Sequence, residues 1–352
     1  MSQGIAQGIT IEQYRYEEIY PSFKAGTDEK QITSSLNQRL LRSLLKAGIP
    51  ASGRPLKVGD IGCGPCDTIL MYLDKLDFAP GFRIRATDFN SEYCNPDSGI
   101  ALAALGKAQR ENRVTIPDFS VRQGDSFAGN LLDLLHHDGE NGNRNSFDIV
   151  FASHMLYHAG SEAQVHTMLN DVVQNLLNES GIFILYHAAP EHGSLIDFRA
   201  RYGRRSAVLE KSDTPAVNIG DPVACTAQYC ANNRFPYFEL KFDARLFMPG
   251  LTDDHWRIFH EPRHYAELAQ KHPAACENLR RLMFVTQRAP LEFADDKSPS
   301  GLDAYLGEAR RVIERNGGHM LLAERLQIIC RRDAPKHVIT GLRDAIKGLQ
   351  AK

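Results

Sequence analysis

An apolar segment, a glycine turn and a helix start follow one another in residues 56–68, and this order constrains the fold more than any other feature. The sequence there is LKVGDIGCGPCDT, and the next apolar segment ends in Asp88. A glycine turn between a strand and a helix lets a ligand lie against bare backbone. An acid at the next strand end can hold a ribose diol through charge-assisted hydrogen bonds. We therefore expect Asp60, Gly62, Gly64 and Asp88 to bind an adenosine-containing cofactor.

Apolar and helical segments alternate along the following residues. Strands are expected at 56–61, 83–88, 119–123, 147–152 and 181–187, and helices at 65–76, 97–112, 126–137 and 161–178. This alternation is typical of a parallel sheet with right-handed helical crossovers. The sequence thus predicts an α/β fold with a Rossmann-like sheet.

Four parts of the chain are expected from the pattern. They are an N-terminal helical lid at 1–50, a cofactor-binding Rossmann-like core at 51–190, a substrate-side insertion with a terminal β-hairpin at 191–332, and a polar helical tail at 333–352. The hairpin strands are expected at 237–248 and 319–331, with helices at 191–203, 223–234, 252–269, 273–287 and 302–316. Asp28 is expected to cap the helix that follows it.

Charge and cysteine content exclude several classes of function. The formal net charge of −2 over 352 residues gives no electrostatic footprint for nucleic acid. No apolar segment is long enough to be a signal peptide or to span a bilayer. Seven cysteines, mostly widely spaced, do not resemble a disulfide framework. We expect a cytoplasmic protein that acts on a small molecule without membrane or nucleic acid; the pattern does not define its oligomeric state.

The glycine turn also contains a Cys-Gly-Pro-Cys sequence, which is typical of thioredoxin-like redox proteins. A redox site needs a low thiol pKa, and the start of a helix favours one. Asp60 and Asp67 oppose it, because negative charge disfavours a thiolate. The cysteines are therefore expected to pack in the core, and a regulatory Cys63–Cys66 disulfide remains an open alternative.

Asp67 distinguishes between two kinds of adenosine cofactor. It stands where a dinucleotide site has its third glycine, so its carboxylate would compete with a pyrophosphate for the helix N-terminus. S-adenosylmethionine carries no phosphate, and its sulfonium and ammonium groups are cations. The acids Asp60, Asp67 and Asp88 suit such a ligand. The departure from the dinucleotide pattern therefore favours S-adenosylmethionine.

Four motifs in order resemble those of the class I S-adenosylmethionine-dependent methyltransferases. They are DIGCGP at 60–65, Thr87-Asp88, QGDS at 123–126, and FDIVFASHMLYH at 147–158. The resemblance implies that Phe89, Asp125, Ser126 and Ser153 join Asp60, Gly62, Gly64 and Asp88 in binding the cofactor. It also implies a reversed strand in the terminal hairpin, and places the end of the last motif beside the transferred methyl group.

A narrower resemblance, to histamine N-methyltransferase, covers more of the chain. It rests on residues 14–45, the Met155-Leu156-Tyr157 run, the Arg201-Tyr202-Gly203 segment and the paired helices before the last strand. It implies that Glu29 contacts a substrate amine. The sequence departs from that family at His154, where the family has glutamine, and near Glu324, where it has asparagine.

Histidines at predicted strand ends are the candidate catalytic groups. His154, His158 and His187 lie where ligands bind in open α/β sheets. Methylation needs a free lone pair on the acceptor, and a histidine can remove the proton. We expect His154 to be the base, with His158 and Tyr157 beside it. A lone histidine at such a place is more often structural, and no metal is expected.

Acidic and aromatic residues are the candidate substrate ligands. A carboxylate in an apolar strand, as at Glu324, is costly unless it is paired or faces a pocket. Together with Glu29 it favours a cationic substrate, although Glu29 also suits a plain helix start. The full predicted set is Glu29, Tyr20, Phe23, His187, Arg201 and Glu324.

The sequence therefore predicts N-methylation of a small amine or guanidine, with two alternatives left open. One is C-methylation beside the carbonyl of a 2-oxo acid derived from a basic amino acid; a histidine base favours it, and Arg199, Arg201 or Arg204 would hold the acid. The other is a cofactor-binding sensor or partner protein without activity.

Overall fold

The computed structural model describes residues 16–50, 53–135, 144–203, 221–261, 268, 270–289 and 301–350. The chain divides into two compact units. The first unit comprises Met1–Glu29, Ala188–Ala216 and Asp243–Ala323, and the second comprises Lys30–His187, Val217–Phe242 and Glu324–Lys352. None of the described helices has the length and apolar character needed to cross a membrane.

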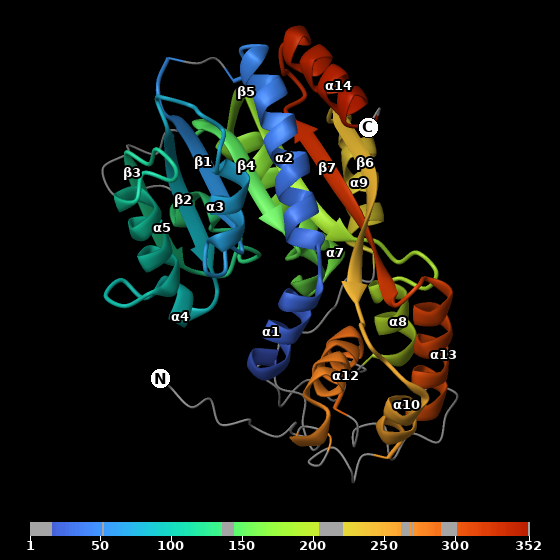
Figure 1. Ribbon diagram of the computed structural model, residues 1–352. Helices are drawn as coiled ribbons and strands as arrows, with labels where there is room; N and C mark the ends of the chain where they lie inside the picture. Colours follow the sequence, from blue (N-terminus) through green and yellow to red (C-terminus); the bar gives the residue numbers. More distant parts are fainter. Residues whose placement is uncertain are drawn as a thin grey trace. The chain divides into compact units, whose positions relative to one another are not determined.

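A seven-stranded sheet runs in the order β3-β2-β1-β4-β5-β7-β6 (Figure 1). The strands are β1 (Leu56–Ile61), β2 (Phe82–Asp88), β3 (Asp118–Gln123), β4 (Phe147–Ser153), β5 (Leu177–Ala188), β6 (Tyr237–Phe247) and β7 (His319–Cys330). Pairing is parallel from β3 through β2, β1 and β4 to β5. β7 runs opposite to β4 in Figure 1. This mostly parallel sheet with one reversed strand confirms the predicted fold class.

Every predicted strand is present, but β5 begins at Leu177, before the predicted residue 181. Its first residues, Asn178 to Ser180, are polar and break the apolar pattern on which the prediction relied. A register shift between Phe147 and Ile149 accommodates them against β4. Sequence periodicity does not detect such a bulge.

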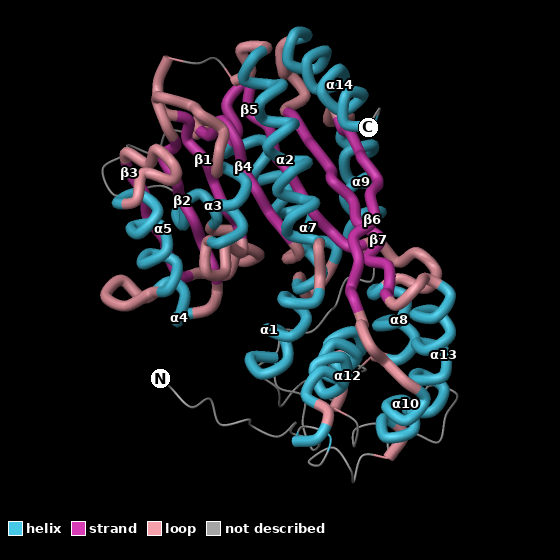
Figure 2. Tube along the Cα trace, in the orientation of Figure 1, coloured by secondary structure: helices cyan, strands magenta, loops and turns pink. Residues whose placement is uncertain are grey.

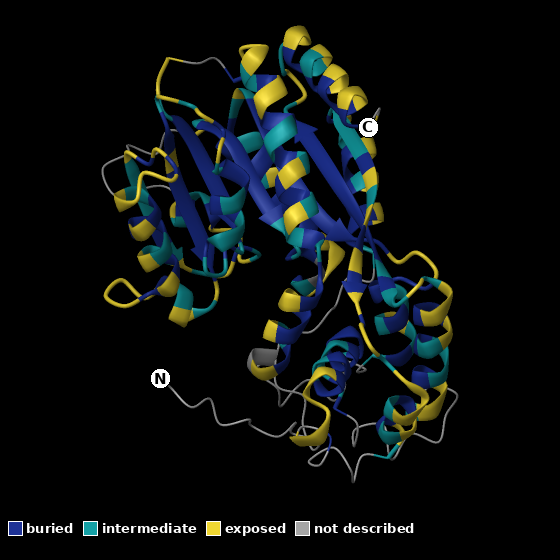
Figure 3. Cartoon of the chain, in the orientation of Figure 1, coloured by how far each residue is buried: buried dark blue, intermediate teal, exposed yellow. Residues whose placement is uncertain are grey.

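Helices cover both faces of the sheet in the second unit (Figure 2). One face carries α2 (Glu29–Lys46), α3 (Asp67–Leu73), α5 (Ile100–Arg110) and α14 (Lys336–Gln350); the other carries α6 (Leu131–Leu135), α7 (Glu162–Asn170), a π-helical turn (Asp171–Leu176) and α9 (Pro222–Asn233). A short α4 (Ser91–Cys94) follows β2. Strands β1, β2 and β4 are buried along most of their length (Figure 3).

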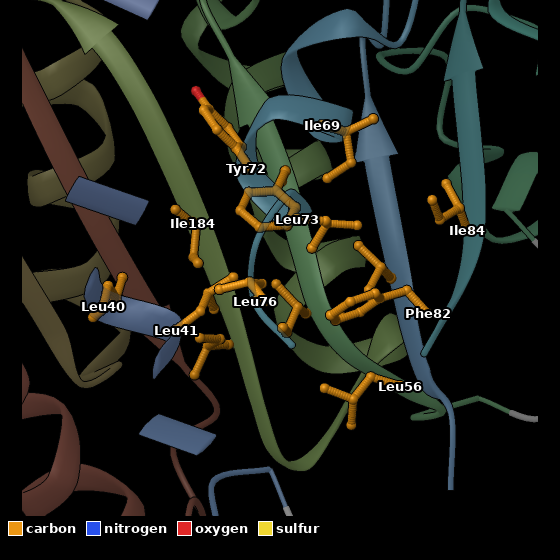
Figure 4. Packing of buried hydrophobic residues seen from close by; sticks show 14 of the residues in the cluster. Leu40, Leu41, Leu56, Ile69, Tyr72, Leu73, Leu76, Phe82, Ile84 and Ile184 are labelled. Carbon is orange, nitrogen blue, oxygen red and sulfur yellow. The ribbon is translucent and has the colours of Figure 1, made fainter. Parts of the chain in front are cut away.

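Alternate residues of each central strand enter different cores. Ile149 and Phe151 of β4 pack with α2 and α3, whereas Val150 and Ala152 pack with α7. Successive side chains of a strand point to opposite faces, so a strand that is covered on both sides must be apolar throughout. In Figure 4, the hydroxyl of Tyr72 points away from the labelled leucines, which belong to the core that contains α2 and α3.

The first unit is mainly helical. Its helices are α1 (Tyr16–Gly26), α8 (Leu195–Tyr202), α10 (Asp253–Phe259), α12 (Pro273–Thr286) and α13 (Leu302–Arg315). The backbone carbonyl of Ser22 in α1 accepts a bond of 3.0 Å from Nε of Arg281 in α12. The ring of Phe23 stacks on Phe284 with centroids 4.0 Å apart. Helix α1 is therefore fixed to α12 by polar and aromatic contacts.

The start of α3 and the cap of α2 differ from the predictions. The helix after the glycine turn begins at Asp67 rather than Pro65, because Cys66 is left-handed with φ of 59°. Asp28 does not cap α2: its carboxylate accepts the N–H of Arg245 at 2.6 Å, while Thr27 Oγ1 accepts the N–H of Glu29 at 3.1 Å. The neighbouring residue provides the cap because Asp28 is bound to β6.

Asp148, near the start of β4, joins three segments of the second unit through its carboxylate. It accepts two bonds of 2.8 Å from the guanidinium of Arg54, one of 2.8 Å from the N–H of Lys57 and one of 2.7 Å from the amide of Asn178. Its side chain is 1% exposed. These bonds connect β4 to β1 and to the polar start of β5.

Asp148→Ala is expected to lower the free energy of unfolding by about 2–4 kcal/mol, because it leaves the buried N–H of Lys57 and the partly buried amide of Asn178 without their acceptor and removes the ion pair with Arg54. Urea denaturation measures this loss. The matched control is Glu111→Ala, which removes an exposed partner 3.8 Å from Lys107 and should change stability by about 0.5 kcal/mol or less. Equal effects of the two substitutions would contradict this role of Asp148.

Candidate functional site

The sheet places its candidate site where the strand order reverses. β1 lies between β2 on one side and β4 on the other. Ligands of open α/β sheets bind beyond the carboxyl ends of the strands at such a reversal. The glycine turn follows β1 there, and His154 follows β4.

The turn after β1 is built from left-handed residues. Gly62 has φ of 68° and Gly64 φ of 52°. The N–H groups of Gly62 and Cys63 donate to the carbonyl of Thr87 at 2.8 and 3.0 Å, which fixes the turn to β2. A Cβ added at Gly64 would meet no atom within 4 Å. The backbone at Gly64 therefore borders open space in which a ligand can lie.

Asp88, at the end of β2, binds this turn through its carboxylate. One oxygen accepts the N–H of Gly64 at 2.8 Å, and the other accepts the N–H of Asn90 at 2.9 Å. Asn90 itself caps α4, so Asp88 is not that helix's cap. Burial is the main cause that raises the pKa of Asp88. A carboxylate has further lone pairs, so these two bonds are compatible with a ribose diol.

Asp60 carries a buried oxygen, Oδ2, that has no hydrogen-bond partner among the described residues. Burial raises the pKa of Asp60 to about 7; the charges of Asp88 and Asp67 act in the same direction, and Lys30 opposes them. A buried acceptor without a donor is costly. The site is thus incomplete by one donor, and a cationic or N–H-bearing ligand would supply it.

The end of β3 lies beside the residues that follow β2. Gly124 donates to the carbonyl of Asp88 at 2.9 Å, and the Gln123 amide donates to that of Phe89 at 3.1 Å. The Phe89 side chain is 57% exposed. An exposed ring next to the carboxylate of Asp88 is suited to stacking on a flat base.

Asp125 and Ser126 form the turn after β3. The carboxylate of Asp125 accepts the N–H of Phe127 at 2.8 Å, the bond of a capping turn. Asp125 is exposed and Ser126 is buried. Asp125 therefore keeps an accessible oxygen at this strand end.

The cysteines of the turn are free thiols in buried surroundings. A hydrogen bond with Cys66 is the largest of the causes that raise the pKa of Cys63, and burial adds to it. The pKa of Cys66 is also raised: its bond with Cys63 acts in the lowering direction, and burial and Asp60 outweigh it. Thiolates are the reactive form of cysteine, so these shifts disfavour redox catalysis.

The structure brings together three predicted residues, His154 just after β4, His187 in β5 and Glu324 in β7. Nε2 of His154 lies 3.7 Å from Oε2 of Glu324, and the rings of His154 and His187 are 6.4 Å apart. His154 is left-handed with φ of 54°, and its N–H donates to the carbonyl of Tyr186 at 2.8 Å. Such a conformation is strained in a non-glycine residue and is concentrated at functional sites.

The three histidines have different surroundings. His187 is fully buried, and burial, followed by the charges of His154 and His158, lowers its pKa well below the usual value. His187 is therefore neutral near pH 7. The His154 side chain is 20% exposed, which leaves it accessible to a ligand. His158 ends the short 3₁₀ helix Leu156–His158, in which the side chain of Tyr157 lies outside the described residues.

A polar group that the sequence reasoning missed lies behind Ser153. The Ser153 hydroxyl is 3.3 Å from the Tyr72 hydroxyl. The ring centroids of Tyr72 and Tyr186 are 5.3 Å apart. Tyr186 in turn donates to Asn37 of α2 at 3.3 Å. Neither tyrosine was among the candidate site residues, because the partners of their hydroxyl groups come from distant segments.

The remaining predicted substrate residues belong to the first unit. The ring centroid of Tyr20 lies 5.8 Å from that of Phe284, the ring on which Phe23 also stacks. Arg201 binds Asp197 and Glu308, with its shortest distances at 2.6 and 2.7 Å. Glu29 is buried at the start of α2. Arg204 lies outside the described residues, and no described group of three His, Cys, Asp or Glu side chains is placed to hold a metal ion.

The sequence matches no protein-family model and no curated protein. Among solved structures, YcgJ from Bacillus subtilis has 16% identity and a TM-score of 0.41, covering 83% of this chain and 98% of its own. A cyclopropane-fatty-acyl-phospholipid synthase-like protein from Lactobacillus casei has 14% identity and a TM-score of 0.42, covering 84% and 92%. Phosphoethanolamine N-methyltransferase 2 of Haemonchus contortus has 12% identity and a TM-score of 0.38, covering 84% and 52%. All three likenesses have a TM-score below 0.5 and an identity below 25%.

The raised pKa of Asp60 predicts a pH-dependent stability. Between roughly pH 4 and 7 the folded protein retains a proton that the unfolded chain releases, so the free energy of unfolding falls as the pH rises. Asp60→Asn removes this loss. Its stability gain over the wild type should grow through that window and level off above about pH 8, at no more than about 4 kcal/mol.

Urea denaturation at a series of pH values measures the difference between the two proteins. Asp97→Asn, at an exposed position outside the site, is the control and should parallel the wild type. A constant difference between Asp60→Asn and the wild type at all pH values would contradict the predicted titration.

Proposed function

We propose that this protein is an S-adenosylmethionine-dependent methyltransferase that N-methylates a small basic metabolite, an amine or a guanidine. The observation that carries the proposal is the buried Asp60 oxygen without a partner beside the open backbone of Gly64. A cationic cofactor without phosphates fits this acidic turn. The parallel sheet and the motifs that resemble class I methyltransferases support the same proposal.

The cofactor would be held by residues at the ends of the first three strands. Asp88 would bind the ribose, Phe89 would stack on the adenine, and Asp125 with Ser126 would face the exocyclic amine. Gly62 and Gly64 would lie against the methionyl part, with Ser153 beyond it. S-adenosylmethionine supplies a sulfonium methyl group, whose bond to sulfur breaks as the bond to the acceptor forms, leaving S-adenosylhomocysteine.

His154 would remove the acceptor's proton. Its ring is accessible, and its Nε2 lies 3.7 Å from the buried carboxylate of Glu324, which would stabilise the imidazolium formed. His187, which burial keeps neutral, would lie beside the His154 ring. His158 and Tyr157 are proposed to lie next to the reacting atoms. An amine that has lost its proton then presents its lone pair to the methyl carbon.

A cationic substrate is the class that these residues favour. Glu324 is buried in β7, and a buried carboxylate is stabilised by a nearby positive charge. Glu29, Tyr20, Phe23 and Arg201, which belong to the first unit, stay predictions from the sequence as substrate ligands.

The pairing of His154 with Glu324 also favours a second candidate, C-methylation beside the carbonyl of a 2-oxo acid. A carbon acid needs a stronger base than an amine does, and a carboxylate next to histidine strengthens it. The substrate's basic end would then meet an acid; Arg199, Arg201 and Arg204 stay the sequence-based candidates for its carboxylate.

Transfer of label from S-adenosylmethionine distinguishes the candidates. Purified protein is incubated with labelled cofactor and with separate amines, guanidines and 2-oxo acids, and the methylated product is identified by mass spectrometry. We expect label in an amine or guanidine. Label in oxo acids alone would replace N-methylation by C-methylation, and cofactor binding without any transfer would indicate a sensor or partner protein.

His154→Gln is expected to lower kcat by about 100-fold or more, because general base catalysis of this kind contributes about 10²–10⁴. The dissociation constant for S-adenosylmethionine should stay within about threefold of the wild type, and the acidic limb of the pH–rate profile should disappear. Exposed His337→Gln on α14 is the control and should retain full activity. An unchanged pH profile in His154→Gln would exclude His154 as the base.

A further inference from the structure

Four side chains at every fourth position of α2 fasten this helix to α3 and the residues just after it. Ser34 and Gln38 both donate to the carbonyl of Met71, at 2.8 and 2.9 Å. Arg42 donates to the carbonyl of Lys75 at 2.7 Å. Because residues three or four apart share one helical face, these bonds set the register of α2 along α3.

Lys30 is the first member of this row and lies nearest to the cofactor turn. Its Nζ donates to Oγ1 of Thr68 at 2.9 Å. Thr68 is the second residue of α3, directly after the turn that contains Gly62 and Gly64. The residue numbers of the bonded partners increase together along α2 and α3, so the two helices run in the same direction. Lys30 therefore lies at the end of α2 that is nearest the turn.

Lys30 and Asp60 place opposite charges beside the same turn. The positive charge of Lys30 acts on the Asp60 carboxyl and favours its ionised form. Asp60 is buried, and its Oδ2 lacks a partner among the described residues. A cation and a carboxylate at one place are complementary to an amino-acid zwitterion, which carries an ammonium and a carboxylate on one carbon.

We propose that Lys30 binds the carboxylate of the cofactor's methionyl group, while Asp60 faces its ammonium. This inference rests on the proposed function, since it concerns the same cofactor. An ammonium has three N–H donors, so the bond to Thr68 is compatible with a second bond to a carboxylate. The neighbouring row of bonds holds the helix, so Lys30 is positioned before the ligand arrives.

Ligands that differ only at the methionyl carboxylate test this role. Binding of S-adenosylmethionine and of decarboxylated S-adenosylmethionine, which keeps the amine, is measured by calorimetry for the wild type and Lys30→Met. We expect Lys30→Met to weaken the binding of S-adenosylmethionine by about 10- to 100-fold and the binding of the decarboxylated ligand by less than about threefold. The wild type's preference for the carboxylated ligand should largely disappear, whereas Lys30→Arg should retain much of it.

Lys46→Met, at the exposed end of the same helix, is the matched control and should bind both ligands as the wild type does. Equal weakening of both ligands by Lys30→Met would overturn the proposal and make Lys30 a structural contact between α2 and α3. If Lys30→Met unfolds, Lys30→Gln with the same ligand pair gives the comparison. Failure of the wild type to bind either ligand would instead overturn the proposed function itself.

Discussion

Parallel pairing of β1 with both β2 and β4 is the constraint on which the rest of the second unit depends. It places the ends of these strands side by side, so that short loops bring Gly64, Asp88 and His154 to one edge of the sheet. The same pairing buries both faces of the strands, and the two cores follow from it. At the opposite edge, Asp148 joins β4 to β1 through charged and backbone hydrogen bonds.

Charge at the site is organised by burial more than by surface ion pairs. Asp60 and Asp88 are both buried and have raised pKa values, so negative charge there is costly until a cation arrives. Backbone N–H groups bind Asp88 without neutralising it. The electrostatic environment of the site thus favours positively charged ligands and disfavours phosphates.

The sequence predicted β1 and β4 well because each contains a short apolar segment bounded by polar or glycine residues. It also predicted Gly62, Gly64 and Asp88 as neighbours, since residues that end adjacent parallel strands meet at one edge. It did not predict the role of Lys30, whose four-residue repeat with Ser34 and Gln38 is visible in the sequence but whose partners on α3 are not. The cap of α2 at Thr27 was missed for the same reason: Asp28 is engaged by distant Arg245. Contacts between distant segments carry no local signal.

The left-handed backbone of His154 sets stability against the proposed role of this residue as the base. Glycine adopts φ of 54° without penalty and asparagine tolerates it, whereas a histidine there stores strain. Selection for folding stability alone would therefore favour glycine or asparagine at this position. A lineage that keeps histidine accepts a less stable protein, and comparison of related chains at this one position would separate those that retain the proposed base from those that have lost it.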